Sequence, residues 1–371
     1  MEKQRISWLD GFRAIAVISV MVYHLTSPFK VHKPDFFSYI FRYGSLGVQL
    51  FFMISGFVIS YTLQRTTGFW AFHVNRFARL FPAMLLCSLL TYGFACWIDY
   101  PVAFPRAHFS ENLLPGLTFI NPQLWSLVFR ADFHWINGSY WTLWTEVQFY
   151  LLASIIYFTN KRHFLTNLLI IGIALSCLKY LPGYGLNNYP DQLASVGLTE
   201  FFRGWNYTNE LFNLCFFIGW FLMGALFYRL YAIGWSWRWQ ISFILVFVFL
   251  VRDNFYYFST ISWSLCAGLV LFCSLFFWLI LRKQQLRVPG DIFFRRVGVI
   301  SYSMYLIHED IGLLLINHFN HVMGSLGFLA PFVVIMLVVG FAEFSFRWYE
   351  RATAKFLKQR LIRADQFNDH P

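Results

Sequence analysis

The sequence predicts an all-α, polytopic membrane protein, a bundle of about ten transmembrane helices with both termini in the cytoplasm. Composition is the first reason: of 371 residues, 58% are hydrophobic and 13% charged, and the mean hydropathy is +0.52. Ordinary soluble domains carry about 25% charged residues. The second reason is a series of long apolar runs, and the third is the uneven distribution of Lys and Arg between those runs.

The apolar runs place the individual helices. Crossing about 30 Å of hydrocarbon takes about 20 helical residues, and a helix satisfies its own backbone hydrogen bonds in lipid. We therefore predict ten spans, the seventh of them short: 11–29, 45–64, 80–98, 140–159, 164–181, 209–228, 239–251, 259–281, 298–317 and 325–346. Two long segments, about 99–139 and 182–208, contain Pro, Asn, Gly and Trp. We predict that they are ordered loops that could form a substrate mouth.

Basic residues give the orientation, because cytoplasmic segments of membrane proteins retain Lys and Arg. An inside amino terminus assigns 20 of the 29 Lys and Arg residues to cytoplasmic segments and 8 to the opposite side, with Arg13 inside the first span. This topology explains the formal net charge of +11. No nucleic-acid partner is expected, since the basic residues punctuate apolar runs instead of gathering on one face.

We divide the chain into a transmembrane domain, residues 1–346, and a cytoplasmic basic amphipathic tail, residues 347–371. Trp348, Phe356, Leu357 and Leu361 lie among basic residues in this tail, a pattern typical of a helix on the inner leaflet. The six cysteines lie in apolar segments, with no CxxC spacing and no His at metal-ligand spacing. We interpret them as small core residues and expect no metal.

The first span carries the best set of polar residues for chemistry. Charged groups inside a bilayer are costly and therefore suggest function, although helix-packing pairs compete as an explanation. Arg13 and His24 are eleven positions apart, about three helical turns plus 20°, and Asp10 lies one turn before Arg13, so the three share a face. A histidine there is a candidate general base, since its unperturbed pKa is about 6.5. A purely structural histidine is the competing interpretation.

Five strings, in this order, resemble the acyltransferase-3 family of bacterial membrane O-acyltransferases. They are WLDGFRAIAVISVMVYH, GVQLFFMISGFVIS, RFARLFP, SYWTLWTEVQFYLL and SYSMYLIHE, and they extend from residue 8 to about 310. The resemblance implies a ten-helix bundle that transfers an acyl group from cytoplasmic acyl-CoA, often acetyl-CoA, to a glycan or another hydroxyl compound at the outer side. It also implies a bacterial inner-membrane location, with the donor, a carbohydrate acceptor and membrane lipids as partners.

The family's motifs carry its functional residues onto particular positions of this chain. The Arg-x10-His pattern falls on Arg13 and His24, and the arginine motif falls on Arg76 and Arg79. The aromatic motif falls on Trp141, Trp144, Glu146 and Tyr150, and the late motif on Ser301, Tyr302, Ser303, Tyr305 and His308. With Arg65 and His73, the motif arginines form a basic cluster suited to the phosphates of coenzyme A. Positive-inside topology explains the same charges.

These residues suggest direct transfer, in which His24 deprotonates the acceptor hydroxyl as it attacks the thioester. Arg13 would orient the donor or stabilise developing negative charge. Glu146 would orient the acceptor or form a structural ion pair. Asp10, Trp141, Tyr305 and His308 are expected to bind substrate or support the site, although a structural hydrogen bond explains His308 and Glu309 equally well.

A covalent route would need an activated nucleophile. The candidates Ser55, Ser301 and Ser303 have no base that the sequence assigns, and we name none of them as catalytic. Glu343 is expected to pair with Arg347, four residues later.

Two other classes of protein compete with an acyltransferase. A proton-coupled secondary transporter of a carbohydrate or related solute would also place Arg, His and Glu inside a bundle. It would usually show matching Gly- or Pro-interrupted segments in its two halves, and we find none. A structural membrane protein would carry few intramembrane charges, unlike the first span.

Overall fold

The computed structural model describes residues 6–26, 41–98, 106–234, 236–257, 262–282, 291–323 and 329–368. Within those ranges every regular element is helical and there is no strand, as the sequence predicts. Several residues counted in the orientation argument lie outside the described residues, namely Lys3, Arg5, Lys30, Lys33, Lys283 and Arg287.

Seven helices of the described part are long and apolar enough to cross a membrane: Trp8–Thr26, Arg42–Leu63, Phe69–Ile98, Phe164–Asn188, Leu214–Ile233, Trp263–Leu281 and Ala330–Ile362. The pair Ile292–Ile307 and Asp310–His318, bent by 74°, would make an eighth span. The chain is therefore a multi-pass membrane protein. Ten spans and two cytoplasmic termini stay predictions.

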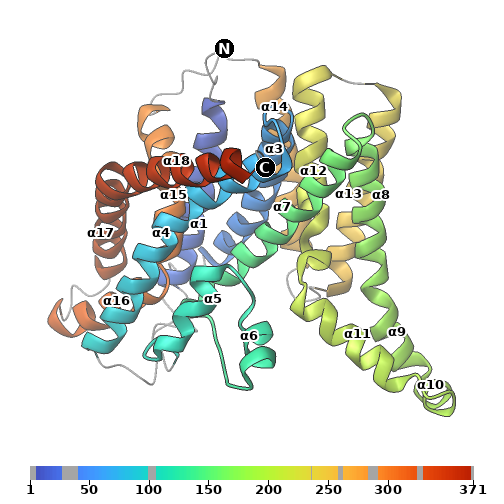
Figure 1. The fold of residues 1–371 in the computed structure, drawn as a ribbon, viewed down its shortest axis with the longest axis horizontal. Coiled ribbons are helices and arrows are strands. Elements are labelled where there is room, and N and C mark those ends of the chain that lie inside the picture. The colour runs from blue at the N-terminus through green and yellow to red at the C-terminus, as the bar shows by residue number, and fades with distance from the viewer. Residues whose placement is uncertain are drawn as a thin grey trace. The chain divides into compact units, whose positions relative to one another are not determined.

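The chain forms two compact units, which we describe separately. The first unit contains residues 1–51, 70–142 and 284–371. Its helices are α1 (Ser7–Thr26), η1 (Arg42–Leu46), α4 (Phe69–Ile98), η2 (Ser110–Asn112), α5 (Leu113–Thr118), α6 (Pro122–Phe129), η3 (Gly138–Tyr140), α15 (Asp291–Ile307), α16 (Asp310–Met323), α17 (Ala330–Ser345), the π-helical turn η5 (Phe346–Glu350) and α18 (Arg351–Asn368). Figure 1 shows them in blue, teal and orange to red.

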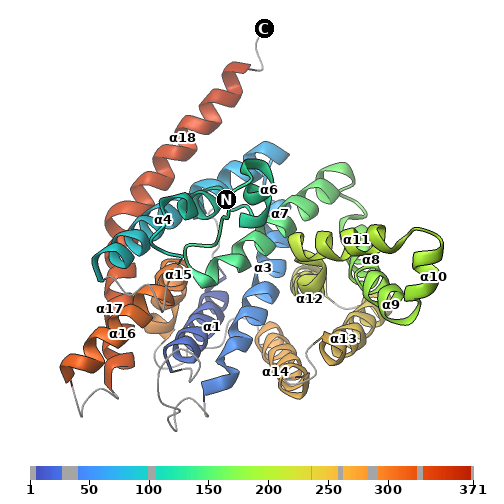
Figure 2. The same cartoon turned by 90° about the horizontal axis from the view of Figure 1, so that it is seen from below.

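The core of the first unit is formed where α1 packs against α15. α15 also packs against α17 (Figure 2). Ala14, Ala16, Val17 and Val20 of α1 are fully buried. The two helices approach so closely that a Cβ added at Gly298 of α15 would lie 1.8 Å from the backbone oxygen of Asp10. Only glycine fits at this crossing, and it fixes the position of the polar end of α1.

The second unit contains residues 52–69 and 143–283. It takes most of α3 (Gly47–Leu63) and α7 (Trp141–Thr159), together with α8 (Phe164–Leu178), α9 (Tyr180–Asn188), α10 (Pro190–Ser195), α11 (Thr199–Leu211), α12 (Leu214–Ile233), α13 (Trp237–Tyr257) and α14 (Ser262–Leu281). α12 is central, because it packs against α8, α13 and α14. It also crosses α3 in backbone contact, where a Cβ at Gly56 would lie 2.0 Å from the oxygen of Phe221.

Three of the predicted spans differ from the structure as follows. α4 begins at Phe69 and not at 80. Its first turns are amphipathic: Arg79 lies on an exposed face, while Phe72, Val74 and Ala78 are buried on the other. The short seventh span, 239–251, is a 21-residue helix, α13. The span predicted at 298–317 breaks at His308 and Glu309.

The predicted loops are largely helical where the structure describes them. Residues 106–139 contain η2, α5 and α6, and residues 182–208 contain most of α9, all of α10 and most of α11. Two of the prolines that suggested loops, Pro122 and Pro190, instead begin helices. Pro122 lies in the first turn of α6 behind Asn121, whose side chain accepts a hydrogen bond from the backbone N–H of Gln123 at 2.9 Å. This is a common arrangement at helix starts.

The cysteines only partly match their interpretation as core residues. All six are free thiols, and Cys87, Cys215 and Cys273 are buried. Cys96 and Cys177 are exposed. In a membrane bundle, an apolar segment also faces lipid, so hydrophobic surroundings in the sequence do not imply burial within the protein.

Candidate active site

The polar stripe of α1 has two parts. Near the start of the helix, Arg13 donates from Nη1 to Asp10 Oδ1 at 3.0 Å, and the Asp10 side chain is only 3% exposed. His24 lies in the last turn of α1. Because a helix rises 1.5 Å per residue, Arg13 and His24 are separated by about 16 Å along the axis. The two residues share a face but do not contact the same atom of a small substrate.

The break between α15 and α16 exposes the last carbonyls of α15, and the segment around η3 satisfies them. Asn137 donates from Nδ2 to the backbone carbonyl oxygen of Leu306 at 3.2 Å. Ser139 donates from Oγ to the backbone carbonyl oxygen of Tyr305 at 3.4 Å. The Tyr305 hydroxyl in turn donates to the Ser139 oxygen at 3.2 Å. Two segments far apart in the sequence therefore hold each other at the 74° bend.

His308, at this break, is fully buried and contacts the first helix. Its Nε2 lies 2.9 Å from Nδ1 of His24, and its Nδ1 lies 2.7 Å from the backbone carbonyl oxygen of Tyr305. The two imidazole planes differ by only 10° and their centroids are 5.1 Å apart. That separation is nearly the longest that the 2.9 Å nitrogen distance permits, so the rings lie edge to edge and the hydrogen bond is in line.

Glu309 adds a carboxylate beside this pair. Its Oε2 lies 3.9 Å from His24 Nδ1, and its side chain is 6% exposed, against 19% for His24. Gly138 makes room for it, since a Cβ there would lie 2.8 Å from Glu309 Oε1. We call His24, His308 and Glu309 the histidine cluster. It combines a partly accessible imidazole with a buried one and a negative charge.

A second polar group, the carboxylate cluster of Glu146, Ser55 and Tyr150, belongs to the other unit. The hydroxyls of Ser55 and Tyr150 both donate to Oε1 of Glu146, each at 2.5 Å. No described residue donates a hydrogen bond to Oε2. α7 itself is anchored at the α11–α12 junction, where Trp144 Nε1 donates to the Leu211 oxygen at 2.7 Å. The carboxylate is thus held through one oxygen, and none of the described residues bonds the other.

The motif arginines lie on α4. Arg76 is half-buried, with its guanidinium 5.5 Å from the centroid of the Phe72 ring, and Arg79 is exposed. His73 lies one turn before Arg76. Arg65, predicted in the same cluster, belongs to the other unit, where its guanidinium lies 4.2 Å from the Tyr61 ring centroid.

The structure brings together some of the predicted residues. Asp10 pairs with Arg13, and His24 pairs with His308, which adjoins Tyr305. Trp141 opens α7, next to Thr142, whose hydroxyl lies 2.9 Å from that of Tyr305. Sequence analysis considered Ser55 only as a candidate nucleophile. Its hydrogen bond to Glu146 had no local signal in the sequence, because the two residues are 91 positions apart.

The late motif's serines have structural partners. Ser301 donates to the Gly298 oxygen of its own helix at 3.0 Å. Ser303 donates to Glu350 Oε1 at 2.6 Å, and Ser345 donates to the same oxygen, also at 2.6 Å. Ser303 is 1% exposed and Glu350 8%, so this contact ties α15 to η5 and offers no accessible nucleophile.

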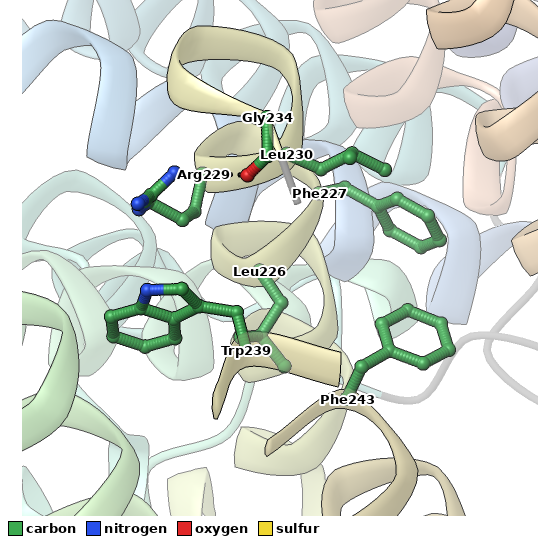
Figure 3. Close-up of a pocket in the computed structure, with 7 residues that line it drawn as sticks. All are labelled: Leu226, Phe227, Arg229, Leu230, Gly234, Trp239 and Phe243. Carbon is green, nitrogen blue, oxygen red and sulfur yellow. Dashed lines mark hydrogen bonds between the residues drawn. The ribbon is translucent and has the colours of Figure 1, made fainter. Parts of the chain in front are cut away.

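One small groove lies where α12 turns into α13 (Figure 3). It is lined by Leu226, Phe227, Arg229, Leu230, Gly234, Trp239 and Phe243. Arg229 donates to the Gly234 oxygen at 3.0 Å, and so closes the end of its own helix. None of the predicted site residues lines this groove. Over the described ranges, no group of three or more His, Cys, Asp or Glu side chains could hold a metal ion.

Comparison with known proteins gives a consistent result. A family model described as an acyltransferase domain matches residues 6–342. An O-acetyl transferase of Shigella phage Sf6 is 28% identical over 46% of this chain and 51% of its own length. The acyltransferase MdmB of Streptomyces mycarofaciens is 26% identical over 40% of this chain and 38% of its own.

A third relative, the peptidoglycan O-acetyltransferase OatA of Listeria monocytogenes, is 27% identical over 47% of this chain and 29% of its own length. The chain thus spans about half, or less, of the length of these curated relatives. No solved structure is detectably similar to it.

Proposed function

This chain belongs to the acyltransferase-3 family of membrane acyltransferase enzymes, and from that premise we propose that it transfers an acyl group from a cytoplasmic acyl-CoA to a carbohydrate hydroxyl. The acceptor would be a cell-surface or lipid-linked carbohydrate, and the protein would lie in a bacterial inner membrane. Acetyl is the acyl group we favour, because relatives carry the name O-acetyltransferase.

The observation that carries this proposal is the hydrogen bond between His24 and His308, with Glu309 beside it, inside a membrane protein. Two histidines and a carboxylate can accept a proton and hold the resulting charge, which is what deprotonation of a hydroxyl requires. His24 is the part of the cluster that a substrate can reach, since it is 19% exposed.

In the proposed reaction, His24 removes the proton of the acceptor hydroxyl while the oxygen forms a bond to the thioester carbonyl carbon. The carbon–sulfur bond then breaks, and the thiolate of coenzyme A takes the proton from His24. An ester and a free thiol result, with no net change in charge. The reaction needs no oxidant and no further reactant.

Arg13 would act on the donor at a distance from the reacting carbon. The rise of about 16 Å between Arg13 and His24 suits a long, extended arm such as the pantetheine of coenzyme A. This spacing favours donor orientation over charge stabilisation at the thioester, the two roles that the sequence left open. Arg76 and Arg79 are the residues we propose for the donor phosphates, because guanidinium groups bind phosphate bidentately.

Glu146 is proposed to orient the acceptor. Its Oε1 accepts two hydrogen bonds within the protein, and Oε2 remains as an acceptor for a substrate N–H or O–H group. The alternative of a structural ion pair finds no support, since the partners in the described structure are hydroxyls. Trp141, Tyr305 and Asp10 would support the site, because each packs within or beside the motifs that carry it.

The decisive experiment measures transfer directly. Purified protein in lipid nanodiscs is incubated with labelled acetyl-CoA and a panel of bacterial glycans, and His24→Ala is compared with His163→Ala, an exposed histidine that precedes α8. We expect label on a glycan with wild type and His163→Ala, and a loss of about 10²–10⁴-fold with His24→Ala. Donor and glycan binding without transfer by wild type would contradict the proposal.

One observation favours the transporter alternative, namely a buried ion pair between Lys179 and Asp253 at 2.7 Å in the second unit. Intramembrane pairs of this kind occur in proton relays. A transporter would carry unmodified glycan or solute into proteoliposomes, and substitution of Lys179 would abolish that uptake. An acyltransferase would show no such uptake.

A further inference from the structure

The hydrogen bonds of the histidine cluster also determine which nitrogen of His24 carries its proton. We propose that His308 is a positioning residue that holds His24 in the tautomer with its proton on Nδ1, so that Nε2 is the basic atom. We further propose that Glu309 compensates the charge of the protonated His24. Both assignments rest on the proposed function, and they name residues that act through His24 without touching substrate.

The argument starts from a group that can only accept. The Tyr305 carbonyl oxygen lies 2.7 Å from His308 Nδ1, and a carbonyl has no proton to give, so Nδ1 of His308 must donate. In neutral imidazole, one nitrogen carries the proton and the other a lone pair. The Nε2 of neutral His308 is therefore an acceptor.

The same logic then fixes the proton on His24. Its Nδ1 lies 2.9 Å from His308 Nε2, in line with the edge-to-edge rings. Since Nε2 of His308 accepts, Nδ1 of His24 donates, and the lone pair of neutral His24 is on Nε2. The backbone carbonyl of Tyr305 thus determines, through one intervening imidazole, which atom of His24 can take a proton.

This control matters because histidine in water prefers the opposite form, with the proton on Nε2. A His24 without its partner would therefore mostly carry a proton on the atom that has to accept one. His308 is suited to prevent this, since it is 0% exposed and its backbone is held at the bend by the contacts around η3. A buried ring with a fixed donor bond has little freedom to change tautomer.

Glu309 acts at the next step. When Nε2 of His24 takes the hydroxyl proton, the ring becomes a cation whose Nδ1 proton still points at His308. The carboxylate lies 3.9 Å from that Nδ1 and is itself 6% exposed. Opposite charges at this distance attract strongly where water is scarce, so the cation is stabilised and the proton needs to move no further than Nε2.

Two substitutions of nearly equal size separate positioning from bulk. In His308→Gln, the side-chain amide reaches the place of the imidazole Nε2 and its oxygen can accept from His24. In His308→Asn, the amide ends near the place of Nδ1 and cannot reach. We expect kcat within about tenfold of wild type for the first and a loss of about 10²–10⁴-fold for the second, with KM for acetyl-CoA and for glycan unchanged in both.

A spectroscopic measurement tests the tautomer without any need for turnover. The ¹⁵N spectrum of histidine-labelled protein in nanodiscs is recorded at about pH 8, where ordinary imidazoles are neutral, and His24 is assigned by its absence in His24→Gln. We expect protonated Nδ1 and unprotonated Nε2 in wild type and His308→Gln, and the reverse in His308→Asn. Glu309→Gln should lower kcat and leave the tautomer of His24 as in wild type.

The outcomes distinguish this inference from the proposed function. Absence of transfer by wild type, with His24 protonated on Nδ1, would refute the acyltransferase proposal and keep the tautomer assignment. Wild-type His24 protonated on Nε2 would overturn the inference whatever the activity, and so would equal kcat values for His308→Gln and His308→Asn. If His308→Asn does not fold, the wild-type spectrum decides alone.

Discussion

Two buried polar clusters of this protein use ionisable groups in opposite ways. In the histidine cluster, His24 is 19% exposed and shares a hydrogen bond with a second imidazole. In the lysine cluster of the second unit (Lys179, Tyr180 and Asp253), the Lys179 side chain is 0% exposed and that of Asp253 5%. Lys179 Nζ contacts Asp253 Oδ1 at 2.7 Å, its Oδ2 at 2.9 Å and the Cys215 oxygen at 3.1 Å.

The difference teaches how to separate chemistry from stability among intramembrane charges. An ammonium group has three N–H donors, and each of Lys179's three contacts is with an acceptor, while Tyr180 also donates to Asp253. These contacts favour a structural ion pair over the proton relay that a transporter would need. The histidine cluster instead contains two imidazoles, side chains that can either donate or accept a proton, and the His24 imidazole is partly accessible. We therefore predict that the lysine cluster contributes to stability and that the histidine cluster carries the proposed reaction.

The largest expected effect would break the lysine cluster. Lys179→Met keeps an aliphatic side chain but leaves Asp253 without its cation, and removal of one partner from a buried pair costs about 3–5 kcal/mol. We expect a lower midpoint of chemical unfolding in detergent, while the protein that remains folded has the acyl-transfer rate of wild type.

A matched double variant provides the control for this prediction. Lys179→Met combined with Asp253→Leu removes both charges, and well-packed apolar replacements of buried pairs are often neutral. Stability should return toward that of wild type. A midpoint as low as in the single variant, or a lost transfer rate with a normal midpoint, would show that the lysine cluster is more than structural.

The next effect decides to which class the carboxylate cluster belongs. Glu146→Gln keeps the size of the side chain and an oxygen that accepts from Ser55 and Tyr150, but it removes the charge. If Glu146 orients the acceptor, transfer should fall by about 10²-fold, as small misplacements of reactants do, and the unfolding midpoint should hardly move. A lowered midpoint with normal transfer would place Glu146 with the lysine cluster.

Some of this architecture is predictable from the sequence. The apolar runs predict the helical membrane bundle, and the spacing of Asp10 and Arg13 predicts their contact, because positions three apart are neighbours on a helix. Family motifs identify His24 as the residue to examine. Each of these signals is local, or resides in the order of short strings along the chain.

What the sequence could not predict depends on distant contacts. His24 and His308 are separated by 284 positions and Ser55 and Glu146 by 91, and a single sequence contains no record of such pairs. The bend at His308 lacks a proline signal as well. The side chains of Asn137 and Ser139 donate hydrogen bonds to the last carbonyls of α15. The break therefore does not leave these backbone groups unsatisfied inside the membrane.

A smaller effect tests the internal support of Glu146. Ser55→Ala removes one of two hydroxyl donors to Oε1, and Tyr150 keeps the carboxylate in place. A hydrogen bond to a charged group contributes about 1.5–3 kcal/mol. Because one of the two donors to Oε1 remains, we expect the loss of hydrogen-bonding free energy to be near the lower end of that range. We expect transfer to fall by about tenfold, measured with saturating donor, and a change below twofold would show that Ser55 does not orient Glu146.

The smallest effect concerns an ion pair that the sequence did predict. Glu343 pairs with Arg347 four residues later, but Arg296 of α15 also binds it, with Nε 2.7 Å from Oε2. The Arg347 side chain is 62% exposed, and exposed pairs contribute only about 0–1 kcal/mol. Because Arg296 keeps Glu343 paired, Arg347→Ala should shift the unfolding free energy by less than about 0.5 kcal/mol. Arg296→Ala, the matched variant, should cost more, since it also unties α15 from α17; equal effects would mean that neither arginine joins the two helices.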